Sequence, residues 1–150
     1  MLIERIDADM KAAARAREAR RLNTIRTLKS QMKYREIEKG KPLDDADVVA
    51  VIASMIKQRK DSASQYLAGG RPELAETENA EIAILETYLP RQLSDDELGA
   101  LVKEAVASSG AKGPKDMGAV MKALMPRIAG QAEGKRVSDA VKGALSKLGA

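Results

Sequence analysis

The sequence contains no cysteine, no histidine, no tryptophan and no phenylalanine, and tyrosine occurs only three times. Without cysteine there can be no disulfide and no thiolate metal site, and without histidine the imidazole base and zinc ligand are missing too. Three aromatic side chains are too few for a protein that binds single-stranded RNA by stacking its bases. These absences exclude catalysis by cysteine or histidine and leave charge and helix packing as the informative properties.

Long apolar runs are also absent. The longest uncharged apolar stretch is Val48–Ile56, whereas a helix needs about 20 apolar residues to cross a bilayer. Charged side chains occur in Met1–Asp7, where a signal peptide needs an apolar core. The lack of cysteine fits a reducing compartment. We therefore expect a soluble, cytoplasmic protein that makes no contact with a membrane.

Good helix formers dominate what the sequence does contain. Apolar residues make up 44% of the chain, and the most frequent residue types are those with high helix propensity, such as Ala, Leu, Lys, Arg and Glu. A chain of 150 residues has room for one domain or two small ones. The composition predicts an all-α fold.

Apolar side chains recur at helical spacing through residues 1–90, between clear start and stop signals. Asp44 has the side chain of a good N-cap, Pro72 suits a first helical turn, and Gly69 with Gly70 suits a helix end. From these signals we predict four helices, at residues 2–14, 17–38, 44–67 and 72–89.

The segment after residue 90 begins with the clearest helix start in the chain. Ser94 and Glu97 have the spacing of a capping box, and Leu93 and Leu98 occupy the two positions of a hydrophobic staple. Two more helical patterns follow. The sequence thus predicts about seven helices in two subdomains, a four-helix part at residues 1–90 and a three-helix part at residues 91–150.

A helix expected to open at Pro114 carries a methionine at every fourth position. An exposed stripe of this kind would be an adaptable binding surface, but we interpret it as core. Pro126 lacks a backbone N–H, so we expect the helix to kink or stop there. A last helix should begin at Gly134 or Lys135. The stripe consists of Met117, Met121 and Met125.

The net charge of +4 is unevenly distributed along the chain. Residues 10–42 hold eleven basic and three acidic side chains, residues 43–90 hold four and nine, and residues 91–150 hold ten and seven. The basic excess permits a polyanionic partner. The first two regions can also neutralise each other.

The main candidate for a binding surface is a set of cations in the last third of the chain, which we call the basic edge. Cations at helix starts and glycine-bounded turns can reach phosphates, in contacts that carry no sequence specificity and weaken with salt. An ordinary solvated helix surface is the alternative interpretation. The basic edge consists of Lys112, Lys115, Lys122, Lys135, Arg136 and Lys142.

A second basic stripe lies beside the apolar face of the second predicted helix. Its members could follow an RNA backbone, but we expect their stems to pack along the core edge and their charged ends to pair with the acidic helices. The stripe consists of Arg15, Arg26, Lys29 and Lys33.

Glu78 and Glu81 stand one turn apart on the fourth predicted helix. Two carboxylates could hold Mg²⁺ or act as acid and base. Because no third acidic ligand has suitable spacing, we expect them instead to pair with Arg59 or Arg71.

Several stretches, taken in order, resemble the YqeY proteins and the C-terminal tail domain of GatB, the B subunit of the tRNA-dependent amidotransferases. The resemblance implies an all-α fold with a four-helix and a three-helix part. In GatB the related domain contacts the tRNA body and lies outside the catalytic part, so the resemblance implies a tRNA-associated module without catalytic residues, cofactor or metal. The stretches are Lys57–Ser62, Tyr66–Ala75, Glu78 with Glu81 and Ile82, Tyr88–Ser94, and Met117–Lys135.

The loop after the sixth predicted helix departs from the family pattern, which has Gly-Arg-Ala-Asp-Gly. Here Gln131 stands in place of the arginine and Glu133 in place of the aspartate. Gln131 removes a guanidinium that could pair with phosphate, which puts RNA contact by this loop in doubt. Glu133 is a poorer N-cap than aspartate and affects the following helix only.

Three functional hypotheses follow. The first is an accessory module that binds tRNA through phosphate contacts of the basic edge and is linked to tRNA-dependent amidation. The second is a protein-interaction adaptor without an RNA role, whose surfaces would be the methionine-rich helix and the space between the subdomains. The third, an amidotransferase that acts alone, lacks a visible nucleophile–base pair or nucleotide-binding loop.

Overall fold

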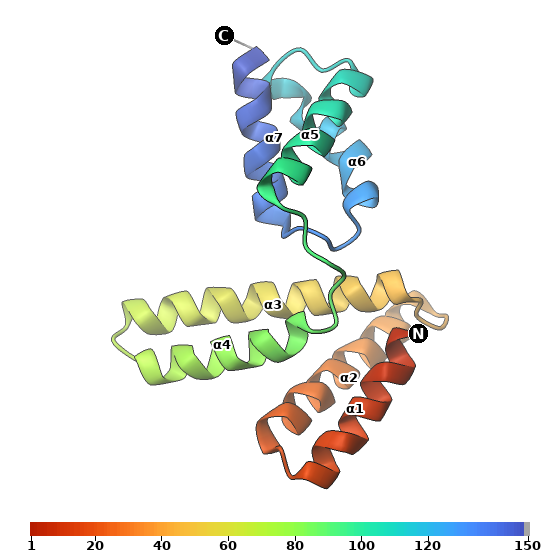
Figure 1. Cartoon of the computed structure of the whole chain (residues 1–150), viewed down its shortest axis with the longest axis vertical. Coiled ribbons are helices and arrows are strands. Elements are labelled where there is room, and N and C mark those ends of the chain that lie inside the picture. Colours follow the sequence, from red (N-terminus) through yellow and green to blue (C-terminus); the bar gives the residue numbers. More distant parts are fainter. Residues whose placement is uncertain (149–150) are drawn as a thin grey trace. The chain divides into compact units, whose positions relative to one another are not determined.

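The computed structural model describes residues 1–148, which form seven α-helices, one short 3₁₀ helix and no strand. The predicted all-α fold is confirmed (Figure 1). The helices are α1 (Leu2–Ala16), α2 (Ala19–Lys39), α3 (Asp45–Ala68), α4 (Pro72–Glu86), α5 (Asp95–Ser109), η1 (Pro114–Asp116), α6 (Met117–Ile128) and α7 (Gly134–Leu148).

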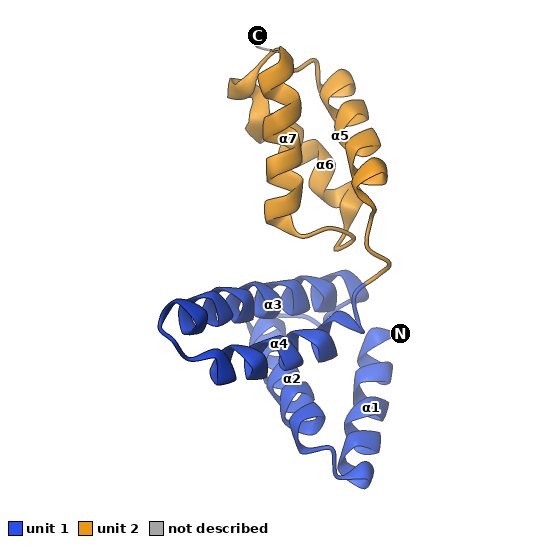
Figure 2. Cartoon of the chain, turned by 60° about the vertical axis from the view of Figure 1, so that its left-hand side comes forward, with its two compact units in different colours: residues 1–89 blue, residues 90–150 orange. Residues whose placement is uncertain are grey.

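The chain forms two compact units, which Figure 2 colours separately. Unit 1 comprises residues 1–89 with helices α1 to α4, and unit 2 comprises residues 90–150 with α5, η1, α6 and α7. Each unit has its own cluster of buried apolar side chains. The two units are therefore described one at a time.

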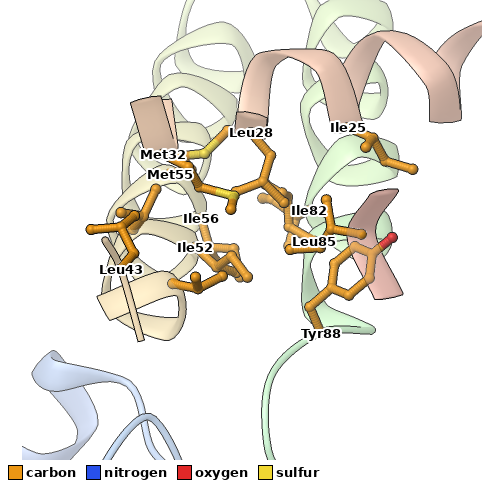
Figure 3. Close-up of a cluster of buried hydrophobic side chains, with 13 residues drawn as sticks. Ile25, Leu28, Met32, Leu43, Ile52, Met55, Ile56, Ile82, Leu85 and Tyr88 are labelled. Carbon is orange, nitrogen blue, oxygen red and sulfur yellow. The ribbon is translucent and has the colours of Figure 1, made fainter. Parts of the chain in front are cut away.

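In unit 1, two helical hairpins enclose the core. Helices α3 and α4 pack along each other, and α1 packs on α2. Figure 3 shows Leu28 of α2, Ile52 of α3 and Leu85 of α4 meeting in this core, and all three are fully buried. Burial of one such side chain stabilises the fold by about 1.5–3 kcal/mol.

In unit 2, the buried side chains come from all three α-helices. Val102 of α5, Leu124 and Ile128 of α6, and Val141 and Leu145 of α7 belong to one cluster and are at most 2% exposed. Their spacing along each helix places them on one face, as the sequence pattern predicts. The fold of unit 2 therefore depends on an aliphatic core with no aromatic side chain in it.

The predicted helix starts at Asp44 and Ser94 are confirmed, and in both a side chain caps the first turn of the helix. The Asp47 backbone N–H donates to the Asp44 carboxylate at 2.8 Å, and the Asp44 backbone N–H donates to the Asp47 carboxylate at 3.0 Å. Ser94 and Glu97 form the same reciprocal box, with distances of 3.1 and 3.4 Å. Such caps satisfy backbone donors that the helix itself leaves free.

Pro126 does not end its helix. Helix α6 continues to Ile128, and the chain leaves it at Ala129 in a left-handed conformation (φ 44°). A proline so close to the helix end removes only one late hydrogen bond, while Leu124 and Ile128 are fully buried on either side of it. Of the two predicted outcomes, a stop is wrong because core packing extends past the proline, and a kink stays a prediction.

Two other predicted boundaries also differ. Helix α1 runs to Ala16 rather than residue 14, because Arg17 ends it in a left-handed conformation (φ 58°). Helix α4 ends at Glu86 rather than at residue 89, and turn hydrogen bonds from the backbone N–H groups of Tyr88 and Leu89 follow. Arg15 consequently belongs to α1 and not to the stripe on α2.

Candidate functional site

The turn before α6 holds two cations of the basic edge. The Asp116 carboxylate accepts hydrogen bonds from the backbone N–H groups of Lys112 and Gly113, at 2.8 and 3.3 Å. These hydrogen bonds, led by the one from Lys112, hold the pKa of Asp116 below its ordinary value. Asp116 thus fixes the turn through the backbone, and the side chains of Lys112 and Lys115 extend into solvent.

Helix α7 brings two more cations to the same side of unit 2. Lys135 and Lys142 are two turns apart, which puts them within about 20° around the helix and about 10 Å along it. Both side chains are exposed. Lys142 lines a shallow groove that also touches η1 and the start of α6. The groove has a volume of about 400 Å³, and its lining residues are Pro114, Met117, Ser138, Asp139, Lys142 and Leu145.

These four side chains form what we call the lysine face of unit 2. It combines the turn around η1 with the adjoining side of α7, since η1 packs on α7. None of the four forms an ion pair with a carboxylate of residues 1–148. The lysine face consists of Lys112, Lys115, Lys135 and Lys142.

Arg136, by contrast, holds two helix starts together. Its guanidinium donates to the carbonyl oxygen of Leu93 at 2.7 Å and to the carboxylate of Asp95 at 2.8 Å. Sequence neighbours on a helix differ by about 100°, so Arg136 faces α5 while the exposed side chain of Lys135 points away from it. The guanidinium N–H groups at Nε and Nη2 of Arg136 thus already donate hydrogen bonds within unit 2.

Lys122 lies apart from the lysine face. It is exposed on α6, and five residues separate it from Met117 at the groove. That separation amounts to about 140° around the helix. The structure therefore places Lys112, Lys115 and Lys142 around η1, and Lys135 lies on the same side of α7 about 10 Å further along the helix. Whether any of them binds RNA stays a prediction.

The loop that carries Gln131 has a structural task. The backbone N–H of Leu93 donates to the Gln131 carbonyl at 2.7 Å, and the Gln92 amide donates to the Gly130 carbonyl at 3.0 Å. These bonds attach the loop to the segment that leads into α5. They use backbone carbonyls, so the exchange of arginine for Gln131 leaves them intact.

The basic stripe of α2 is only partly paired. Lys29 forms an ion pair with Asp7 of α1, 2.5 Å away, rather than with the acidic helices α3 and α4. Arg26 and Lys33 are exposed and form no ion pair within residues 1–148. The expected pairing with the acidic helices is thus wrong for Lys29, because α1 lies alongside α2 and supplies the nearer carboxylate.

The structural interpretation of the glutamates is confirmed for one of them. The Arg59 Nε donates to Glu81 at 3.0 Å, which joins α3 to α4. Arg71 pairs instead with Glu73. No group of three or more carboxylates that could hold a metal ion occurs in the described part of the chain.

Two of the three methionines in the α6 stripe are packed against the core of unit 2. Met117 and Met121 are partly buried there, whereas Met125 is 39% exposed. The interpretation of the stripe as core therefore holds for its first two members. Met125 projects from the end of the helix.

The sequence analysis missed Tyr34 and Ile37, which are 70% and 67% exposed on α2. A signal was present, since both residues fall outside the spacing of Ile25, Leu28 and Met32, the buried face of the helix. Large apolar side chains that miss the buried face of their own helix point to a second surface.

A family model described as "Yqey-like protein" matches residues 3–145. A protein of Lachancea thermotolerans is 38% identical over 88 residues, which cover 58% of this chain and 47% of that protein. One from Kluyveromyces lactis is 40% identical over 87 residues, which cover 57% and 47%. Both are named "Altered inheritance of mitochondria protein 41, mitochondrial".

A protein of the same name from Saccharomyces cerevisiae is 32% identical over 94 residues, which cover 62% of this chain and 51% of that protein. The matched segments thus span about half the length of these curated relatives. No helix of residues 1–148 has the length and apolar character needed to cross a membrane. Since the family model covers nearly the whole sequence, the chain belongs to the YqeY-like protein family.

Proposed function

We propose that unit 2 binds folded RNA, and tRNA in particular, through contacts of the lysine face with backbone phosphates. The observation that carries the proposal is the difference in pairing within unit 2. Lys112, Lys115, Lys135 and Lys142 extend into solvent and form no ion pair within residues 1–148, although Asp116 attracts Lys112 and Lys115 at longer range. The arginines at positions 91, 127 and 136 are all held in ion pairs.

Arrangement supports the proposal as well. A phosphate backbone is a row of charges. Lys142 lies beside the η1 turn that carries Lys112 and Lys115, and Lys135 extends the set of cations by about 10 Å along α7. The scarcity of aromatic side chains favours recognition of shape and backbone over stacking of bases. The resemblance to the tail domain of GatB points to tRNA among folded RNAs and to an accessory role in tRNA-dependent amidation.

The test is a titration of the full chain with total tRNA at salt concentrations from 50 to 300 mM. The variant replaces Lys112, Lys115, Lys135 and Lys142 with glutamine. A control removes the same charge from exposed lysines elsewhere, at Lys11, Lys103, Lys122 and Lys147.

The slope of log Kd against log salt should fall by about 3 in the variant, because each lost phosphate contact contributes about 0.7–0.9. The control variant should keep most of the slope that the parent chain shows. Absence of binding at 50 mM salt, or equal loss in variant and control, would remove the proposal.

A protein-interaction adaptor without an RNA role is the alternative. Of the surfaces first considered for it, the methionine stripe of α6 offers only the exposed part of Met125. A partner that stays bound to the full chain after nuclease treatment, together with no tRNA binding, would favour this alternative.

We also propose a cytoplasmic location for this chain, although the relatives have "mitochondrial" in their names. Fractionation of cells that produce the untagged chain tests the location. Recovery in an organelle fraction would contradict it.

A further inference from the structure

A second surface lies in unit 1, between the later turns of α2 and the earlier turns of α3. There a groove of about 520 Å³ opens to solvent. Val51 and Met55 of α3 form an apolar floor and are 9% and 3% exposed. Tyr34 and Ile37 of α2 also line the groove, and both are about two-thirds exposed. Large apolar side chains beside an apolar groove are typical of a docking surface.

Polar side chains complete the lining. Gln31 and Glu38 come from α2, and Ser54 and Gln58 come from α3. None of them closes off the apolar floor, and amides and hydroxyls can donate to or accept from a partner at the groove edge. An apolar floor with polar side chains around it is the usual arrangement of an interface centre and its rim.

The charges around the groove are not balanced. Lys33 adjoins Tyr34 on α2 and Lys57 adjoins Gln58 on α3, whereas Arg26 lies five positions before the first lining residue, Gln31. None of these three cations forms an ion pair within residues 1–148. Arg35 and Glu38, which line the groove, pair with each other at 3.0 Å and neutralise each other. Two unpaired cations, Lys33 and Lys57, therefore lie beside the groove, and the exposed carboxylate of Asp61 lies one turn beyond Gln58.

The dimensions fit one kind of occupant. The lining residues span positions 31–38 of α2 and 50–58 of α3, which corresponds to about 10–12 Å along each helix. A partner helix with apolar residues at i, i+3 or i+4, and i+7 presents anchors over the same length. Phosphates would find no partner on Val51, Met55 or Ile37, so an RNA backbone fits the floor poorly.

We infer that this groove docks an amphipathic helix of a partner protein, whose apolar stripe covers Val51 and Met55 and whose flanks carry Asp or Glu opposite Lys33 and Lys57. Complementary charge selects the partner and speeds association, while the apolar contacts supply the affinity. The site is separate from the lysine face and needs no RNA.

A selection from a displayed library of random helical peptides tests the inference, with the full chain as bait. The variant Ile37→Asp puts a charge at the groove edge. The matched control is Leu67→Asp, which changes another exposed apolar residue, 59% exposed near the end of α3 and outside the groove. Circular dichroism checks that both variants keep the helical content of the parent chain.

The selected peptides should carry an apolar stripe at helical spacing and an excess of acidic residues. Ile37→Asp should weaken the best peptide at least tenfold, whereas Leu67→Asp should change its Kd less than twofold. Reversal of charge by Lys33→Glu with Lys57→Glu should weaken it further than Lys11→Glu does.

Other outcomes would overturn the inference. These are selected peptides without acidic excess, peptides that bind Ile37→Asp as tightly as the parent chain, and a dimer of the parent chain that Ile37→Asp dissociates. Single-stranded RNA that binds the parent chain and is lost in Tyr34→Ala would assign the groove to nucleic acid instead.

Discussion

The two units use their basic side chains differently. In unit 1, both lysines and arginines form ion pairs between helices, as in Lys29 with Asp7 and Arg59 with Glu81, while Arg26 and Lys33 stay unpaired. In unit 2, each ion pair formed within residues 90–148 contains an arginine, and the lysines are left in solvent. The comparison teaches that an excess of basic residues does not by itself mark a binding surface. The informative property is which cations lack a carboxylate.

The units also differ in what connects their helices. In unit 1, the Tyr88 hydroxyl donates to Asp9 at 2.7 Å, and Arg5 lies over the Tyr88 ring, 4.9 Å from its centre. Figure 3 shows Tyr88 at the margin of the apolar cluster. Unit 2 has no tyrosine and depends on aliphatic packing. Unit 1 should therefore tolerate loss of core volume better.

The largest expected effect comes from truncation of the core of the smaller unit. Leu145→Ala should cost about 2–5 kcal/mol, which is most of the stability of a unit of about 60 residues. Leu85→Ala should cost unit 1 a similar free energy and leave it folded at 25 °C. Hydrogen exchange with mass spectrometry, resolved by segment, measures both. A Leu145→Ala chain that stays protected throughout α5 to α7 would contradict the comparison.

A smaller effect is expected for Tyr88→Phe. The change removes one hydrogen bond to a charged partner and should destabilise unit 1 by about 1.5–3 kcal/mol, as measured by urea unfolding at pH 7. Unit 2 should be unaffected. If the free energy of unfolding is unchanged, the Tyr88 hydroxyl does not join the turn after α4 to α1.

The same tyrosine should make unit 1 less stable at alkaline pH. Burial, with the Asp9 carboxylate as a further cause, raises the pKa of Tyr88 well above 10.0. At pH values above 10.0, Tyr88 loses its proton in the unfolded chain but keeps it in the folded chain. The free energy of unfolding therefore falls as the pH rises. Tyr88→Phe should flatten this fall.

The smallest effects are expected at the helix starts, where the two units should behave alike. The hydrogen bond from Lys39 lowers the pKa of Asp47 to about 2, and the hydrogen bonds from Arg91 lower the pKa of Glu97 to about 2. A carboxyl group whose pKa is lower in the folded chain than in the unfolded chain stabilises the fold at pH values above the unfolded pKa. That contribution is lost as the pH falls from about 4.5 towards 2.

Asp47→Asn should therefore flatten the acid dependence of unit 1, and Glu97→Gln that of unit 2. Thermal melts between pH 2 and 6 provide the measurement, with Ser64→Ala, a change at an exposed position of α3, as a neutral control. If the melting temperature of both variants still falls steeply as the pH is lowered, carboxylates other than Asp47 and Glu97 cause the acid sensitivity.

Sequence reasoning succeeded where the cause is local. The capping boxes at Asp44 and Ser94 join residues three apart, so their pattern is visible in the sequence itself. It failed at Pro126, where the burial of Leu124 and Ile128 outweighs the local preference to stop. Tertiary packing routinely overrides propensity in this way.

Parts of the candidate site could not be predicted because their partners are distant in sequence. Arg136 pairs with Asp95, 41 residues away, and this pairing alone distinguishes it from Lys135. Likewise, the approach of η1 to α7 decides which lysines share a face. Sequence alone supplies the set of cations but not which of them remain unpaired.

The salt dependence of tRNA binding by the full chain tests the central claim most directly. We expect the four glutamine substitutions in the lysine face to lower the slope of log Kd against log salt by about 3, while the four substitutions at Lys11, Lys103, Lys122 and Lys147 leave most of it. Equal slopes for the two variants would show that unpaired lysines beside η1 and α7 are ordinary solvated side chains.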